Sequence, residues 1–301
     1  MKLIYGDIIN EIRFNSYPTG RGVGVAVFDT GVYPHEDLKK QIIGFKDCIK
    51  DRKRNQNNYD NNGHGTHIAG IIAGSGASSG GKFRGMAPHA NIIGIKVLNY
   101  KGIGKVEYIA EGVSWLIKNK ELYNIKIANF SVGGTAEKED EKEIFFTNTI
   151  RKLADAGIIV VAAAGNNGPD KGSITVPGIC KEVITVGSSD DEIPVKIGNY
   201  NEFIKDYSGR GKISSIYMKP DITAPGSYIT SCHNSRKGYT VKSGTSMATA
   251  VITGAICMYL EKHKFADVEE VRKKLCITAY DNGREEYEQG CGLINIKRFL
   301  E

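Results

Sequence analysis

The chain has 301 residues and a formal net charge of +6 at pH 7, with apolar and charged fractions that are ordinary for a globular protein. A chain of this length buries about 75% of the surface that its unfolded form exposes, so it needs no metal or disulfide to form a core. The modest charge accompanies no nucleic-acid-binding motif, which excludes a nucleic-acid-binding protein. The one basic cluster, at Lys50, Arg52, Lys53 and Arg54, is interpreted as a solvated loop.

Short apolar runs rich in β-branched residues alternate with helical patterns along the chain. The predicted strands are Val23–Phe28, Asn91–Leu98, Ile125–Val132, Ile158–Ala163 and Val183–Val186. Each run is nearly continuous, as expected for strands that are covered on both faces. A helix is predicted over Lys105–Lys118, because its apolar residues repeat at helical spacing. The alternation predicts an α/β fold with three layers, in which a mostly parallel central sheet has helices on both faces.

No repeat, low-complexity tract or Pro/Ser-rich linker divides the chain. We therefore expect a single domain over residues 1–301, with residues 1–20 as an N-terminal extension. The N-terminus lacks an apolar run long enough for a signal peptide. The longest apolar stretches, around Gly157–Gly165 and Met247–Leu260, are too short to span a bilayer. We therefore expect no membrane partner.

The six cysteines are scattered and form no CxxC pair; they are Cys48, Cys180, Cys232, Cys257, Cys276 and Cys291. In a chain of this size, this distribution predicts reduced thiols in the core and no disulfide framework. A cytoplasmic location follows from that interpretation. The alternative is the processed form of a secreted precursor, to which a Met has been added.

Asp29 ends the first predicted strand, directly after five apolar residues, in GVAVFDTG. A buried carboxylate is costly unless another group neutralises it or donates hydrogen bonds to it. An imidazole would do so, and the carboxylate would then select the tautomer of that ring. The alternative is an aspartate that caps the following turn. Functional groups gather at the carboxyl ends of strands in such sheets, and Asn166 also follows a predicted strand.

His64 lies between two glycines at the predicted start of a helix, in NNGHGTHIAGIIAG. The small residues of this segment allow a close approach to neighbouring backbone. His67 lies three residues later, which raises the alternative of a zinc site. However, HExxH is absent and no third ligand has suitable spacing. The segment therefore favours a catalytic histidine over a metal ligand.

Ser246 follows Gly244 and Thr245 and begins a long apolar helix, in SGTSMATAVITGAICMYL. A serine at this position is often only an N-cap. The same position exposes the hydroxyl and directs backbone N–H groups toward a nearby oxyanion. The residue alone leaves both interpretations open.

The segments GVGVAVFDTG, HGTHIAG and SGTSMA, in this order, resemble the three active-site motifs of the subtilisin-like serine proteases, the subtilases. The order Asp, His, Ser is that of subtilisin. Further stretches resemble the family as well, so that the resemblance covers nearly the whole chain: GKFRGMAPHANIIGIKVLN, NFSVGG, VVAAAGNNGPD, PGICKEVITVG and KPDITAPG. The segments SGASSGGKFRGMAP and GNNGPD resemble the intracellular branch more than the secreted enzymes.

The resemblance implies a serine endopeptidase with a subtilisin-like fold. Ser246 would be the nucleophile, and His64 would act as the base and then as the acid. Asp29 would hold His64 in the required tautomer. The side chain of Asn166 and the backbone N–H of Ser246 would stabilise the oxyanion.

The resemblance also implies how a protein or peptide substrate binds, as an added β-strand. One wall of the cleft would be Ser131, Val132 and Gly133, and the other Gly102, Ile103 and Gly104. The primary specificity pocket would be lined by Ala163, Ala164 and Gly165, with Thr175 at its back. A threonine makes this pocket shallower than a glycine would, which favours small or medium apolar side chains. The acidic run Glu137–Glu143 is interpreted as a solvated helix start.

Three departures from the family pattern are visible. Ala250 stands where the family usually has proline, which should alter little. Asp37 matches a calcium-binding carboxylate of the family, but the corresponding loop reads SGASSGG and offers few suitable side-chain oxygens. No high-affinity calcium site is predicted, and the chemistry needs no metal or cofactor. Only 28 residues precede Asp29, too few for a prodomain, so we expect a processed form or a protein that folds unaided.

The main competing hypothesis is an inactive member of the same fold that serves as a binding or scaffold protein. Against it, all four expected catalytic positions are present. An α/β-hydrolase would need GxSxG, which is absent around Ser246. A cysteine peptidase would use Cys291, but no histidine follows it. We expect a monomeric endopeptidase.

Overall fold

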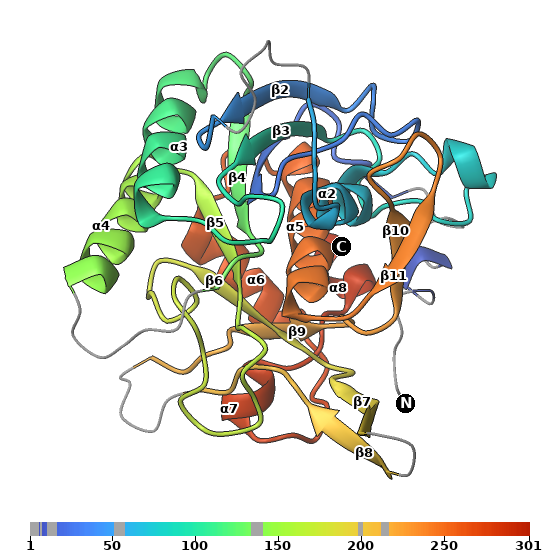
Figure 1. The fold of residues 1–301 in the computed structure, drawn as a ribbon. Coiled ribbons are helices and arrows are strands. Elements are labelled where there is room, and N and C mark those ends of the chain that lie inside the picture. The colour runs from blue at the N-terminus through green and yellow to red at the C-terminus, as the bar shows by residue number, and fades with distance from the viewer. Residues whose placement is uncertain are drawn as a thin grey trace.

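A computed structural model describes residues 6, 8–10, 17–50, 58–133, 141–197, 201–211 and 217–301 (Figure 1). The strands are β1 Gly24–Asp29, β2 Ile42–Asp47, β3 Asn91–Lys96, β4 Ile125–Phe130, β5 Ile159–Ala163, β6 Ile184–Ser188, β7 Glu192–Ile197, β8 Asn201–Asp206, β9 Ile222–Ala224, β10 Ile229–Cys232 and β11 Tyr239–Lys242. The α-helices are α2 His64–Ala73, α3 Val106–Asn119, α4 Glu141–Asp155, α5 Thr245–Lys262, α6 Val268–Thr278, α7 Glu286–Gln289 and α8 Ile296–Leu300. A short 3₁₀ helix, η1, spans Ala77–Ser79.

Seven strands form one central sheet in the order β2-β3-β1-β4-β5-β6-β9, and all neighbouring pairs are parallel. The strand order reverses at β1, which has β3 on one side and β4 on the other. Ligands of such sheets bind beyond the carboxyl ends of the strands at this reversal. Asp29, the last residue of β1, lies there. The topology confirms the predicted α/β fold with a parallel sheet.

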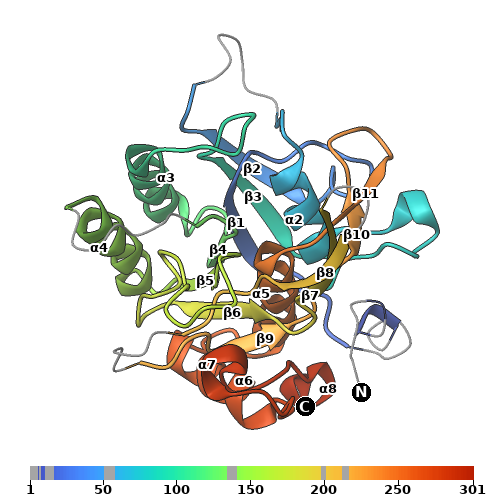
Figure 2. The same cartoon turned by 60° about the horizontal axis from the view of Figure 1, so that its bottom comes forward.

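The apolar strands feed two separate cores, one on each face of the sheet. In β1, Val25 and Val27 pack into one core while Ala26 and Phe28 pack into the other, because successive side chains of a strand point to opposite faces. Helices α2 and α5 cover the first face, and α3 and α4 cover the second (Figures 1 and 2). A nearly continuous apolar run is therefore what a strand in this layer requires.

Helix α5 is the central helix of the fold, and its first 16 residues, Thr245–Leu260, are all buried. It packs against α2 and against β4, β5 and β6, and α8 lies against it as well. Figure 2 shows α6, α7 and α8 grouped beyond β9, at the edge of the sheet. A helix that is apolar all round belongs in such a core. Its N-terminus, which carries Ser246, is thus held rigidly.

The five predicted strands and the predicted helix all form, with ends that differ by at most two residues. The sequence missed β2 and β9. Strand β2 is only partly buried and β9 has three residues, so neither has a strong apolar run. The antiparallel pairs β7–β8 and β10–β11 were also not predicted.

The cysteine prediction was wrong for two of the six residues. Cys276 and Cys291 form a disulfide, with Cα atoms 5.0 Å apart, while Cys48, Cys180, Cys232 and Cys257 are free and buried. Tyr280 and Leu293 exchange backbone hydrogen bonds of 2.8 and 2.7 Å. These bonds bring the segment that carries Cys291 back to the end of α6, which carries Cys276. A spacing of 15 residues carries no local signal of this return.

No helix in the described ranges combines the length and the apolar character that crossing a membrane requires.

Candidate active site

Asp29 lies at the carboxyl end of β1, and its side chain is fully buried. Nδ1 of His64 is 2.9 Å from both of its carboxylate oxygens. The backbone N–H of Thr30 donates a further hydrogen bond of 2.7 Å to Oδ1. These donors compensate the burial of the carboxylate, as the sequence argument required.

The segment before His64 is held by Asp60, which is also buried. One oxygen of its carboxylate accepts from the N–H groups of Asn62 and Gly63, and the other accepts from the N–H and hydroxyl of Thr66. Four donors on a single carboxylate fix the turn that begins α2. The orientation of His64 therefore follows from a buried acidic residue that sequence reasoning did not single out.

Gly65 allows α2 to approach β1 closely. A Cβ atom at this position would lie 2.1 Å from the carbonyl oxygen of Gly31 and 3.0 Å from Cβ of Asp29. No side chain fits there without moving the backbone. The glycine after His64 is thus required for the contact between His64 and Asp29.

Two opposing effects set the pKa of His64. Burial lowers it, and the charge and hydrogen bond of Asp29 raise it, with the net result that the pKa of His64 is raised above its usual value. The positive charge of Lys242 also lowers the pKa of His64, by less than burial does. Because Asp29 accepts the hydrogen on Nδ1, the neutral ring keeps its lone pair on Nε2, the nitrogen that a general base needs.

Ser246 is the second residue of α5, and 9% of its surface is exposed. Its hydroxyl donates to the carbonyl oxygen of Ser131 at 3.2 Å, and not to His64. Ser131 directly follows β4, the strand next to β1. The fold thus brings together the ends of two neighbouring strands and the start of the central helix.

Asn166 follows β5 and lies beside the N-terminus of α5. Its Oδ1 accepts from the N–H and the hydroxyl of Thr245, both at 3.0 Å. This orientation leaves the amide NH₂ as the group that can donate to a ligand. A Cβ on Gly244 would lie 3.2 Å from Nδ2, which places the NH₂ at the turn just before Ser246.

A cleft of about 590 Å³ runs beside His64. Both predicted walls line it, the residues 102–104 on one side and 131–133 on the other. Its remaining lining residues are Thr30, Asn62, Leu98, Lys105, Val106, Ile109, Phe146 and Lys242. The structure therefore joins the two segments that the resemblance assigned to substrate binding. The acidic run Glu137–Glu143 lies outside what the structure describes in side-chain detail.

Thr175 lies between the predicted wall and the predicted specificity pocket, and is buried. A Cβ at Gly133 or at Gly165 would come within 2.5 or 2.6 Å of its hydroxyl oxygen. Its backbone N–H donates to the carbonyl of Ala164 at 3.0 Å, and Ala163 ends β5 beside it. The threonine side chain fills the space between the two glycines.

Lys96 is a second residue near the site that sequence reasoning missed. It ends β3, is fully buried, and its ammonium donates to the carbonyls of Thr30 and Leu98 and to Oδ1 of Asn61, at 2.7, 2.8 and 3.0 Å. Thr30 and Leu98 both line the cleft. A lysine inside a predicted apolar strand was the available signal, because buried lysines are rare without partners.

His67 is a neutral core residue and not a metal ligand partner of His64. Its Nε2 lies 3.1 and 3.2 Å from the carbonyls of Ile229 and Thr240. Burial, and next the neighbouring His64, lower the pKa of His67 to about 3. The ring faces the hairpin β10–β11 while His64 faces Asp29, so the two histidines serve different neighbours.

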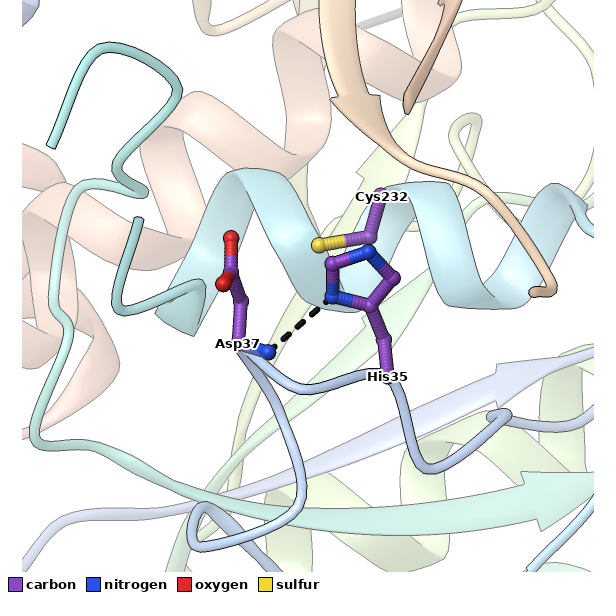
Figure 3. Close-up of side chains that lie close together, drawn as sticks. All are labelled: His35, Asp37 and Cys232. Carbon is purple, nitrogen blue, oxygen red and sulfur yellow. Dashed lines mark hydrogen bonds between the residues drawn. The ribbon is translucent and has the colours of Figure 1, made fainter. Parts of the chain in front are cut away.

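His35, Asp37 and Cys232 form a buried group whose potential ligand atoms lie within 4.8 Å of one another (Figure 3). Both ring nitrogens of His35 and both carboxylate oxygens of Asp37 already have a protein partner. The ring of His35 accepts from the N–H of Asp37 and contacts the carbonyl of Gly238, both at 3.0 Å. The carboxylate of Asp37 accepts from the N–H of Ser78 at 2.8 Å and from the hydroxyl of Tyr239 at 2.6 Å.

Asp37 matches a calcium-binding carboxylate of the family, and these contacts decide whether its surroundings suit a cation. Burial, and then the charge of Asp37, raise the pKa of the Cys232 thiol, which keeps it protonated. The loop over Asp37 contributes a backbone N–H, a donor that a cation would repel. The donor set around this carboxylate therefore does not fit a bound cation.

Comparison with known proteins identifies the family. The model of the Subtilase family matches residues 20–292. The chain is 41% identical to "Serine protease AprX" of Bacillus subtilis, over 95% of this chain and 68% of that protein. It is 32% identical to "Subtilisin DY" of Bacillus licheniformis, over 92% of this chain and 90% of that protein.

Solved structures agree. "Sphericase" superposes with a TM-score of 0.81 at 28% identity, covering 98% of both chains. "S41 Psychrophilic Protease" superposes with a TM-score of 0.79 at 30% identity, covering 97% of both chains. Because the family model matches most of this chain and the relatives are similar over nearly all of it, this chain belongs to the subtilase family and is a subtilisin-type serine endopeptidase.

Proposed function

We propose that the chain hydrolyses peptide bonds through a triad of Asp29, His64 and Ser246. The observation that carries this proposal is the pair of 2.9 Å contacts between His64 and the buried carboxylate of Asp29, at the edge of a cleft. Ser246 lies at the start of α5, and its hydroxyl donates to the carbonyl of Ser131. Ser131, like His64, lines the cleft. Hydrogen bonds between a nucleophile and its base are often long or poorly aligned before substrate binds, and they tighten in the complex.

In the first step, Oγ of Ser246 attacks the carbonyl carbon of the scissile bond while its proton passes to Nε2 of His64. The new O–C bond forms as the carbonyl π electrons move to oxygen. When the tetrahedral intermediate collapses, the C–N bond breaks and Nε2 returns the proton to the leaving amine. Asp29 stabilises the imidazolium between these events. Water then hydrolyses the acyl-enzyme by the same route and regenerates Ser246.

The negative oxygen of the intermediate needs donors that are already in place. The NH₂ of Asn166 supplies one, because Thr245 occupies the other end of this amide. The backbone N–H of Ser246 supplies the second, at the positive end of the α5 dipole. The N–H of Ser246 belongs to α5, and two hydrogen bonds from Thr245 hold the amide of Asn166, so little reorganisation accompanies the reaction.

Substrate binds as an added strand between residues 102–104 and 131–133. Ala163, Ala164 and Gly165 line the pocket for the side chain before the cleaved bond. Thr175 limits its depth, since it fills the space between Gly133 and Gly165. We propose a preference for small or medium apolar side chains at this position.

The test is labelling with a fluorophosphonate probe, followed by mapping of the adduct by peptide mass spectrometry. A stoichiometric adduct on Ser246 is expected, and the variant His64→Ala should lose it. Circular dichroism confirms that the variant is folded. Folded wild-type protein that forms no adduct would contradict the proposal and favour the inactive scaffold.

We propose further that neither calcium nor another cofactor is needed for activity. The support is the hydrogen bonding of Asp37, whose two carboxylate oxygens accept from Ser78 and Tyr239. Peptidase activity and thermal midpoint should be the same after dialysis against EDTA as after dialysis against calcium. Activity that is lost after EDTA and returns with calcium would contradict this proposal.

The cytoplasmic location is also a proposal. It is supported by four free, buried cysteines and by the relative named "Intracellular serine protease" of Paenibacillus polymyxa, 35% identical over 79% of this chain and 67% of that protein. Stable disulfides belong to oxidising compartments. A cytoplasmic location therefore requires that the Cys276–Cys291 disulfide be reduced in the cell. Alkylation in freshly lysed native cells should find both cysteines reduced, and finding them oxidised would support the secreted alternative.

We propose that residues 1–301 act as one peptidase domain and as a monomer. The family model spans most of that length, which supports the first statement. Light scattering after size exclusion tests the second, and a dimer mass would contradict it.

A further inference from the structure

A buried chain of hydrogen bonds lies beneath the cleft and connects helix α5 with strand β4. The hydroxyl of Thr253 donates to Oδ1 of Asn129 at 2.8 Å, and Nδ2 of Asn129 donates to the hydroxyl of Ser131 at 2.9 Å. The hydroxyl of Ser131 donates to the backbone carbonyl of Ser246 at 3.3 Å. Thr253 and Asn129 are fully buried, and Ser131 and Ser246 are 6% and 9% exposed.

The direction of each bond depends on the one before it. Because Thr253 donates to the oxygen of the Asn129 amide, the NH₂ of that amide must face Ser131. Ser131 therefore accepts at its oxygen, and its single hydroxyl hydrogen is left to donate to Ser246. If the amide were reversed, the single hydrogen of Ser131 would donate to Asn129, and the Ser131 oxygen would face the acceptor carbonyl of Ser246 in a buried region.

Ser131, the last side chain of this network, makes two hydrogen bonds with Ser246. The side chain of Ser131 holds the backbone of Ser246, while the backbone carbonyl of Ser131 accepts the Ser246 hydroxyl at 3.2 Å. Ser131 also lines the cleft. One residue thus sets the distance between the attacking oxygen and the wall on which the substrate strand lies.

Thr253 itself is remote from the chemistry. It lies seven residues after Ser246 on α5, about two turns along the same helix face, and it does not line the cleft. Neither Thr253 nor Asn129 can touch a substrate strand bound in that cleft. Any effect of these residues on catalysis must act through Ser131 and the backbone of Ser246.

We propose that Thr253 and Asn129 are positioning residues. Through Ser131, they hold the backbone of Ser246 at the position from which its hydroxyl attacks the substrate. This inference rests on the proposed role of Ser246 as the nucleophile. Small displacements of a reacting group, of the order of 1 Å, cost up to about 10²-fold in rate. A buried hydrogen-bond network that fixes the backbone of Ser246 prevents such a displacement of its hydroxyl oxygen.

The test compares Thr253→Val with Thr253→Ser. Valine has the shape of threonine but lacks the hydroxyl, and it leaves the amide of Asn129 free to rotate; serine keeps the donor. Thr253→Val should lower kcat about tenfold, with KM within about twofold, because ground-state contacts with the substrate are unchanged. Thr253→Ser should restore kcat to within about threefold of wild type, which a merely space-filling role would not do.

Thr249→Val is the matched control. Thr249 is also a fully buried threonine of α5, but its hydroxyl donates to the carbonyl of Thr245 within the helix at 2.7 Å and takes no part in the network. Its substitution should leave kcat and KM unchanged. Thermal midpoints of all three variants separate lost stability from lost positioning.

The proposal is overturned if Thr253→Val keeps kcat within twofold of wild type while its thermal midpoint falls. If Thr253→Val does not fold, Asn129→Asp takes its place, because a carboxylate keeps the acceptor for Thr253 but cannot donate to Ser131. An unchanged kcat in that variant would equally overturn the inference. Failure of wild-type protein to react with the fluorophosphonate would instead count against the triad itself.

Discussion

The Nδ1 atom of His64 is equidistant from the two carboxylate oxygens of Asp29, at 2.9 Å from each. The aspartate is fully buried, and His64 is partly exposed at the cleft. A buried carboxylate opposite one ring nitrogen leaves the other nitrogen for the substrate side. In the proposed mechanism, this asymmetry lets Asp29 orient His64 as the base and stabilise its protonated form.

Replacing Asp29 by asparagine should lower kcat about 10⁴-fold, because an amide no longer selects the tautomer with a lone pair on Nε2. The charge of Asp29 raises the pKa of His64, so its removal should also move the acid limb of the residual kcat/KM profile to lower pH. The pH dependence of kcat/KM measures both effects. Asp155→Asn, an exposed aspartate at the end of α4, should change neither. An unshifted acid limb in Asp29→Asn would contradict the assignment of His64.

Asn166→Leu should lower kcat about 10²–10³-fold with little change in KM, since the amide donates to charge that exists only in the transition state. That range comes from subtilisin itself, a member of the same family. Thr245→Val should have a smaller effect, because the N–H of Thr245 still holds Oδ1 of Asn166 when the hydroxyl is lost. Steady-state kinetics on one peptide substrate checks both. A rise in KM without loss of kcat would show that Asn166 only binds substrate.

Thr175→Ala should deepen the specificity pocket. The change removes the atoms that fill the space between Gly133 and Gly165, so the ratio of kcat/KM for Leu or Phe over Ala at the cleaved position should rise at least about tenfold. Thr175→Val keeps the shape of the side chain and should leave this ratio unchanged. Profiling with a peptide library measures it. Equal profiles for all three proteins would place the pocket elsewhere.

Loss of the Cys276–Cys291 disulfide should lower the free energy of unfolding by about 3 kcal/mol, the value for a closed loop of 15 residues. The double variant Cys276→Ser/Cys291→Ser should show this loss in urea unfolding but keep wild-type kcat, because Cys276 lies in α6, Cys291 follows α7, and neither lines the cleft. Dithiothreitol should lower the stability of wild-type protein to that of the variant and leave the variant unchanged. Equal stabilities without reductant would refute the contribution of the disulfide.

The sequence alone determined the architecture and the identity of the chemistry. Apolar runs such as Ile125–Val132 are local signals, because a strand buried on both faces must be apolar along its length. The motifs around Asp29, His64 and Ser246 are also local, since each needs a particular turn and particular close approaches. Gly65, for example, is required because a Cβ atom at this position would lie 2.1 Å from the Gly31 carbonyl oxygen, so its position in the motif reflects the geometry.

Only the tertiary structure decided how distant positions cooperate. Asn129 and Thr253 are 124 residues apart, and Ser131 and Ser246 are 115 apart, yet each pair shares a hydrogen bond. The pairing of Cys276 with Cys291 likewise depends on how the chain returns past β9. A buried polar residue gains its partner from folding, and nothing in its neighbouring sequence names that partner. For this reason short motifs sufficed to predict the proposed catalytic residues, whereas the groups that contact them could not be predicted.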